Sequence, residues 1–179
     1  MVAAHALGDA PSALAFARQS GVIPQNSDTL VPGHFIQYYM FLWNNDDRIP
    51  ALRYFRALAD SDPTPSVLNN IAWLLATALW SPAPSSEAVD IARRALDTLP
   101  PDSPLRPTLL DTLSVALAND GQYDAAVSTI SEAIATLPPS SPSLPAMHSR
   151  LALYRQSLPY RELLGTPVPL DKYTYDPHF

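Results

Sequence analysis

The chain of 179 residues has no cysteine, a single lysine, five glycines and no long apolar run. Without cysteine it can form no disulfide, thiolate metal site or cysteine nucleophile. The longest apolar stretch, Ile71 to Trp80, is far shorter than the roughly 20 residues of a membrane-spanning helix. Direct membrane insertion is therefore not expected. Residues 1–20 lack the basic start of a signal peptide. The compartment stays open: cytoplasm by default, or periplasm if the chain is cut from a larger membrane-anchored protein.

Basic side chains are scarce, and the motifs of common active sites are missing. The formal net charge is -6, and an acidic chain repels phosphate backbones, so nucleic acid is not an expected partner. The four histidines are dispersed, and there is no Gly-rich phosphate loop or Gly-x-Ser-x-Gly turn. Asp46-Asp47 is interpreted as turn and capping chemistry rather than a carboxylate pair. We expect no catalytic residue, no metal site and no cofactor, and we do not interpret the chain as an enzyme.

Proline and apolar residues are abundant instead. Apolar residues make up 47% of the chain and charged residues 16%, which is typical of a globular protein. Most of the 20 prolines stand between apolar segments, where they end one helix or begin the next. Within the segments the spacing is helical, as in Leu68, Ile71, Ala72 and Leu75. The sequence therefore predicts an all-α fold.

The predicted helices come in pairs and suggest a repeat. The clearest unit runs from Pro107 to Ser140, which is 34 residues. It contains expected helices at about 107–119 and 123–136, joined by a turn at Gly121. Large and small residues alternate at fixed places within this unit: Leu110, Leu113, Ser114, Leu117, Tyr123, Ala126, Ile130, Ala133 and Pro138. Small residues at such places let two antiparallel helices approach closely, and large ones fill the gap to the next pair.

The other units are looser versions of this one. We expect helical hairpins at about 1–24, 32–63, 65–100 and 107–138, followed by a capping helix at 143–157. The cap should turn Arg150 and Arg155 outward. The predicted repeat domain is thus residues 1–160, and residues 161–179 are an extended C-terminal tail, either draped on the body or free.

The sequence resembles the tetratricopeptide repeat (TPR) family over roughly residues 34–160, and in particular C-terminal TPR-type domains of bacteria. The resemblance is carried by three segments: Leu68-Asn-Asn-Ile-Ala-Trp-Leu-Leu-Ala-Thr77, Leu110 to Ala118, and Gly121-Gln-Tyr-Asp-Ala-Ala126. The ending Arg150 to Arg155, with Pro159-Tyr-Arg161, is also similar to the close of such domains. The family implies an α-solenoid, a right-handed superhelix whose concave face binds a peptide or a partner's surface.

The resemblance also implies which side chains line the concave groove. They are Ile36, Met40, Trp43, Asn44, Asn69, Trp73, Thr77, Asp111, Val115 and Asn119. Asparagine can pair with a peptide backbone and tryptophan can cover its apolar side chains. The alternative for each is a structural role, with Trp73 packing on a neighbouring hairpin. The expected function is a non-catalytic protein-protein interaction scaffold. Two alternatives remain, an accessory or regulatory domain of a larger enzyme or membrane-anchored assembly, or a homo-oligomer built through its end hairpins.

Overall fold

The computed structural model describes residues 10–19, 40, 42–43, 48–78, 81, 83–100 and 102–161. Its helices are α2 (Ala10–Gln19), α4 (Arg48–Ser61), α5 (Pro65–Thr77), α6 (Ser85–Asp97), α7 (Arg106–Asn119), α8 (Tyr123–Thr136) and α9 (Leu144–Tyr154). The all-α prediction is confirmed for this part of the chain. The hairpin expected at 1–24 and the first helix of the next one lie largely outside the described residues, as does the tail from 162 onward.

The chain separates into two compact units, one with α2 and α4 and the other covering Pro63–Leu163. In the first unit, α4 buries an apolar stripe of Ala51, Leu52, Tyr54, Phe55 and Ala59. The Trp43 ring meets Phe55 edge-on at 5.9 Å between centroids. The Arg48 side chain donates a hydrogen bond to the Trp43 carbonyl at 3.2 Å. An aromatic cluster therefore forms the core of this unit.

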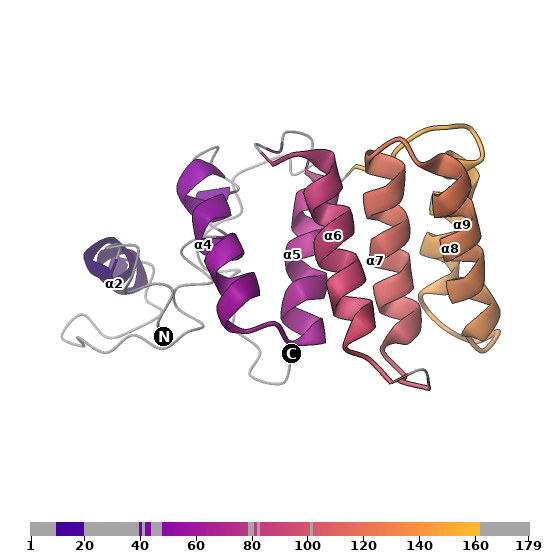
Figure 1. Ribbon diagram of the computed structural model, residues 1–179, viewed down its shortest axis with the longest axis horizontal. Coiled ribbons are helices and arrows are strands. Elements are labelled where there is room, and N and C mark those ends of the chain that lie inside the picture. The colour runs from indigo at the N-terminus through magenta and orange to yellow at the C-terminus, as the bar shows by residue number, and fades with distance from the viewer. Residues whose placement is uncertain are drawn as a thin grey trace. The chain divides into compact units, whose positions relative to one another are not determined.

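The second unit holds five helices, α5 to α9, each packed on the next along the chain (Figure 1). Alternate helices also touch, since α5 contacts α7 and α7 contacts α9. Proline stands in the first turn of each of these three, at Pro65, Pro107 and Pro145. Its missing N–H is not needed there, and its fixed φ suits the start of a helix.

Helix α7 is the centre of this unit and is covered on most sides. It contacts α5, α6, α8 and α9, and nine of its residues are buried. Small buried residues on the surrounding helices permit the close approach, among them Ala72, Ala92, Ala126 and Ala133, each no more than 1% exposed. Ser114, predicted to be a small packing residue, is fully buried and donates its hydroxyl to the Asp111 carbonyl at 2.6 Å. Small residues at these contacts therefore allow α7 to be enclosed by its four neighbouring helices.

Two helix ends share one turn geometry. Gly121 follows α7 with a φ of +78°, and the Gln122 N–H reaches the Leu117 carbonyl at 2.8 Å. The Gly121 N–H reaches Ala118 at 3.2 Å, which completes a Schellman motif. The same pattern ends α9, where Ser157 takes the left-handed position with a φ of 55°. There the Leu158 N–H bonds the Leu153 carbonyl at 3.1 Å, and the chain turns back after the helix.

Surface contacts join successive helix pairs. The Ser85 hydroxyl, at the start of α6, donates to the Asp120 carboxylate in the turn after α7. The side-chain amide of Gln122 donates to the same carboxylate at 2.7 Å. These two hydrogen bonds lower the pKa of Asp120 below its ordinary value. The turn that carries Gly121 is thereby attached to the preceding pair of helices.

Candidate functional site

A buried ion pair lies between α7 and α9. The Arg150 Nε donates to Asp111 Oδ1 at 2.9 Å, and its Nη2 donates to Oδ2. Each residue is only 7% exposed. Burial raises the pKa of the Asp111 carboxyl, while the charge and hydrogen bonds of Arg150 act in the opposite direction. The two-bond geometry fixes the plane of the guanidinium group, and with it the way this group faces its other neighbours.

Those neighbours are two aromatic rings. The Arg150 guanidinium carbon lies 5.4 Å from the ring centroid of Trp73, on α5. It lies 5.3 Å from the ring of Tyr160, which follows α9. The two rings are 6.0 Å apart and tilted by 49°. Both distances fall within the range of cation–π attraction, worth about 2 kcal/mol when the cation is partly desolvated. Arg150 thus links α5, α7, α9 and the chain after α9.

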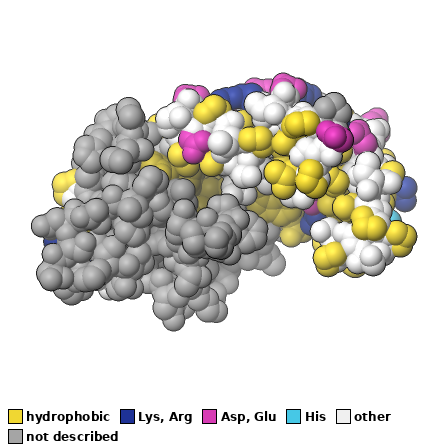
Figure 2. Space-filling view, turned by 90° about the horizontal axis from the view of Figure 1, so that it is seen from below, with side chains coloured by type: hydrophobic (Ala, Val, Ile, Leu, Met, Phe, Trp, Pro, Cys, Tyr) yellow, Lys and Arg dark blue, Asp and Glu magenta, His cyan; other side chains and the backbone are white. Residues whose placement is uncertain are grey.

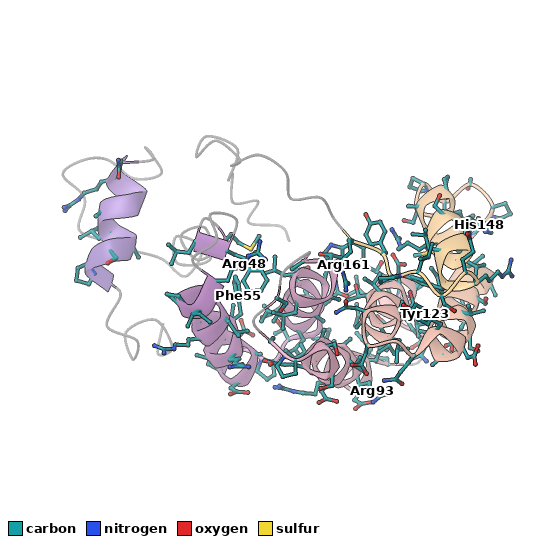
Figure 3. All side chains as sticks on the ribbon, turned by 90° about the horizontal axis from the view of Figure 1, so that it is seen from above. Arg48, Phe55, Arg93, Tyr123, His148 and Arg161 are labelled. Carbon is teal, nitrogen blue, oxygen red and sulfur yellow. The ribbon has the colours of Figure 1, made fainter. Side chains whose placement is uncertain are left out.

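The residue after Tyr160 extends this contact to the end of α5. Arg161 donates from Nη1 to the Ala76 carbonyl at 2.9 Å, across 85 residues of sequence. Ala76 lies in the last turn of α5, where carbonyls have no partner within the helix and carry partial negative charge. In Figure 3, Arg161 and Arg93 of α6 lie on opposite sides of the helices. Pro159 to Arg161 thus lie across the side formed by α5, α7 and α9. We name this side, formed by α5, α7 and α9, the inner face.

The predicted groove residues differ in burial and in the unit to which they belong. Ile36 and Asn44 lie outside the described residues, and Met40 is half-buried. Trp43 has no exposed surface and belongs to the unit that contains α4. On the inner face, Asn69, Trp73 and Asn119 are half-buried.

Three other predicted positions are in the interior. Val115 is 0% and Thr77 1% exposed, and the Thr77 hydroxyl bonds the Trp73 carbonyl of its own helix at 2.9 Å. The Asp111 carboxylate is paired with Arg150. Their expected place on an open groove is therefore corrected: Asp111 and Val115 are buried on α7, which four helices contact, and Thr77 is buried at the end of α5. Arg150 contacts both Trp73 and Asp111.

The prediction that Arg150 points outward is wrong. A buried arginine is rare unless it is paired, and its partner Asp111 is 39 residues away, beyond any local pattern. The sequence pattern likewise does not place Tyr160 and Arg161 among the groove residues. The available signal was the aromatic-arginine pair directly after a helix end, Pro159-Tyr-Arg161. The predicted boundary between body and tail falls between two residues that both contact the inner face.

Three further observations concern metal binding, membrane spans and surface charge in the described part of the chain. Within the described ranges, no three His, Cys, Asp or Glu side chains lie close enough to hold a metal ion. None of the helices described has the length and apolar content to cross a bilayer. On the face shown in Figure 2, acidic and basic side chains are interspersed rather than gathered by sign. What the site offers is one buried cation between aromatic rings, and the carbonyls of a helix end.

No protein-family model matches the chain, and neither a curated protein nor a solved structure matches it.

Proposed function

We propose that the chain is a non-catalytic interaction scaffold, an α-solenoid of the TPR type that binds another polypeptide in extended form on the inner face. The packing order of α5 to α9 supports the solenoid, because each helix contacts the next and alternate helices contact one another. Helix pairs that stack in this way form one continuous face from the first helix of each pair.

A single observation carries the binding role. A non-helical segment of the chain itself, Pro159 to Arg161, follows α9, and its Tyr160 and Arg161 side chains make aromatic, cation–π and hydrogen-bond contacts with the inner face. A surface that accepts one such segment has the side chains and the carbonyls needed to accept another. Half-buried Trp73 supplies apolar area, as tryptophan often does where interfaces bind most strongly.

The test is site-specific photo-crosslinking of the full chain. A photoreactive phenylalanine analogue replaces Trp73, which preserves an aromatic ring at the inner face. The matched control places the same analogue at Arg93, an exposed position of α6. We expect crosslinks from position 73 to map by mass spectrometry to one segment of a partner polypeptide, and none to that segment from position 93. Equal yields from both positions, or partner crosslinks from position 93 alone, would contradict the proposal.

A further inference from the structure

The chain after α9 is turned back over the inner face by its own sequence. Ser157 adopts the left-handed conformation that ends α9, and Leu158 closes the turn with a hydrogen bond to Leu153. Pro159 follows, and it cannot continue the helix because its ring removes the backbone N–H. The next two side chains, Tyr160 and Arg161, then reach Arg150 and α5. We name residues 158–161 the strap.

The strap uses two kinds of recognition side by side. The Tyr160 ring stands on the guanidinium of Arg150, whose orientation is fixed by the carboxylate of Asp111. The adjacent Arg161 donates to a carbonyl in the last turn of α5, where the helix dipole favours a cation. An aromatic ring followed directly by a guanidinium satisfies both places. The Arg150 guanidinium and the end of α5 therefore bind a tyrosine followed by arginine better than they bind either residue alone.

One polar group of the inner face is not satisfied by the strap. The Oδ1 atom of Asn69 is buried and has no hydrogen-bond partner. Asn69 precedes Trp73 by one turn of α5, on the same side of the helix. A buried acceptor without a donor is unfavourable, and a ligand that brings an N–H to it removes that cost. A bound polypeptide can donate to this atom only once the groups that bury it have moved aside.

Resting on the proposed function, we infer that the inner face is a recognition site for an aromatic residue followed by arginine, and that the strap fills this site in cis. With the strap in place, as in this structure, the site is closed. A partner segment with the same chemistry binds by displacing the strap. Since the site is free only in the fraction of molecules with the strap released, the apparent affinity for a partner is reduced by that fraction.

The experiment uses a labelled peptide with the strap sequence and the residues around it, Gln156 to Leu163, and the full chain. Fluorescence anisotropy compares wild type with the Tyr160→Ala/Arg161→Ala variant, in which the strap has lost its contacts. We expect the variant to bind the peptide on the order of tenfold more tightly than wild type. Peptides with alanine in place of tyrosine or arginine should lose most of this binding. The control variant Arg155→Ala/Gln156→Ala changes two exposed neighbours and should match wild type.

Several outcomes would overturn the inference. They are equal affinity of wild type and variant, no binding to either, or binding that is indifferent to the tyrosine and the arginine of the peptide. A variant that dimerises by light scattering without binding the peptide would mean that the face takes a second copy instead. Far-UV circular dichroism reports folding, and Arg161→Ala alone serves as the second variant. If that single change also unfolds the protein, the segment is part of the core and the inference fails.

The same variants separate this inference from the proposed function. The photoreactive analogue at position 73 is compared with and without the Arg161→Ala change. Equal crosslinking to a partner segment would support the scaffold function and contradict the inference that the strap blocks the site. Loss of all crosslinks at position 73 rejects the scaffold function, whereas the peptide titration still decides whether the site reads a Tyr-Arg pair.

Discussion

The buried pair of Asp111 and Arg150 allows a strong test of how α7 and α9 are held together. Asp111→Ala leaves the Arg150 guanidinium buried, at 7% exposure, without its carboxylate. Removing one member of a buried pair costs about 3–5 kcal/mol, because the remaining charge is desolvated and uncompensated. For a unit of about 100 residues each kcal/mol lowers Tm by at least about 4 °C, so the expected loss exceeds roughly 10 °C.

The assay is a double-mutant cycle measured by urea denaturation with circular dichroism. Asp111→Ala and Arg150→Met are made singly and together. We expect the double variant to be more stable than the sum of the single losses predicts, with a coupling of about 0.5–3 kcal/mol, as for residues in direct contact. Arg150→Met should lower the free energy of unfolding more than loss of the ion pair alone would, because it also removes the contacts with Trp73 and Tyr160. Exposed Arg155→Met is the control and should change stability by less than about 0.5 kcal/mol.

The reasoning would be refuted by two results together. One is a loss below about 1 kcal/mol for each single variant, which is the range of surface ion pairs. The other is strict additivity in the double variant. Such a pair would lie in solvent and would not orient the guanidinium between Trp73 and Tyr160.

Three further predictions concern the turns. Gly121→Ala should destabilise by about 1 kcal/mol through its positive φ alone, since nothing lies within 4 Å of an added Cβ, and Gly121→Asn should cost less in the same urea titration. Ser157→Gly should stabilise by about 0.5–1 kcal/mol, because glycine adopts the left-handed conformation freely; a lower urea midpoint would contradict the assigned turn. Ser85→Ala should raise the pKa of Asp120 toward 3.8, measured by NMR titration of its carboxyl carbon. The folded-state pKa of Asp120 is lowered, so its stabilisation is present above about pH 4 and is lost as pH falls through the folded value. An unchanged titration in Ser85→Ala would contradict the hydrogen bond.

Apolar periodicity located the helices because burial on one side of a helix leaves a regular trace in sequence. Helix α7 begins within one residue of its predicted start, and α8 has the predicted bounds. Gly121 was predicted as a turn because few other residues suit that conformation, and its positive φ agrees. Such features depend on residues close together along the chain.

The contacts of the inner face, by contrast, join residues that are far apart in the sequence. Arg150 looks like a solvent-exposed residue in sequence, since a periodic pattern assigns every charge to the outer side of a helix. Only packing reveals that an acid on α7 meets it. The sequence pattern misplaces Val115 because α7 contacts four other helices, and it misplaces Thr77, which is buried in the last turn of α5. The contact of Arg161 with Ala76 crosses 85 residues, so the sequence pattern does not predict it.

The contact between Arg161 and α5 has a consequence for unfolding. A stack in which each helix touches only its neighbours can fray from either end, one repeat at a time. Here the chain after the last helix is bonded to the carbonyl of Ala76, in the first helix of the unit. Helix α9 is also tied to α7 through Arg150. Such cross-links couple the two ends, so α9 should not melt ahead of α5. Amide hydrogen-exchange protection in α5 and in α9 should then be lost together, in a single coincident transition.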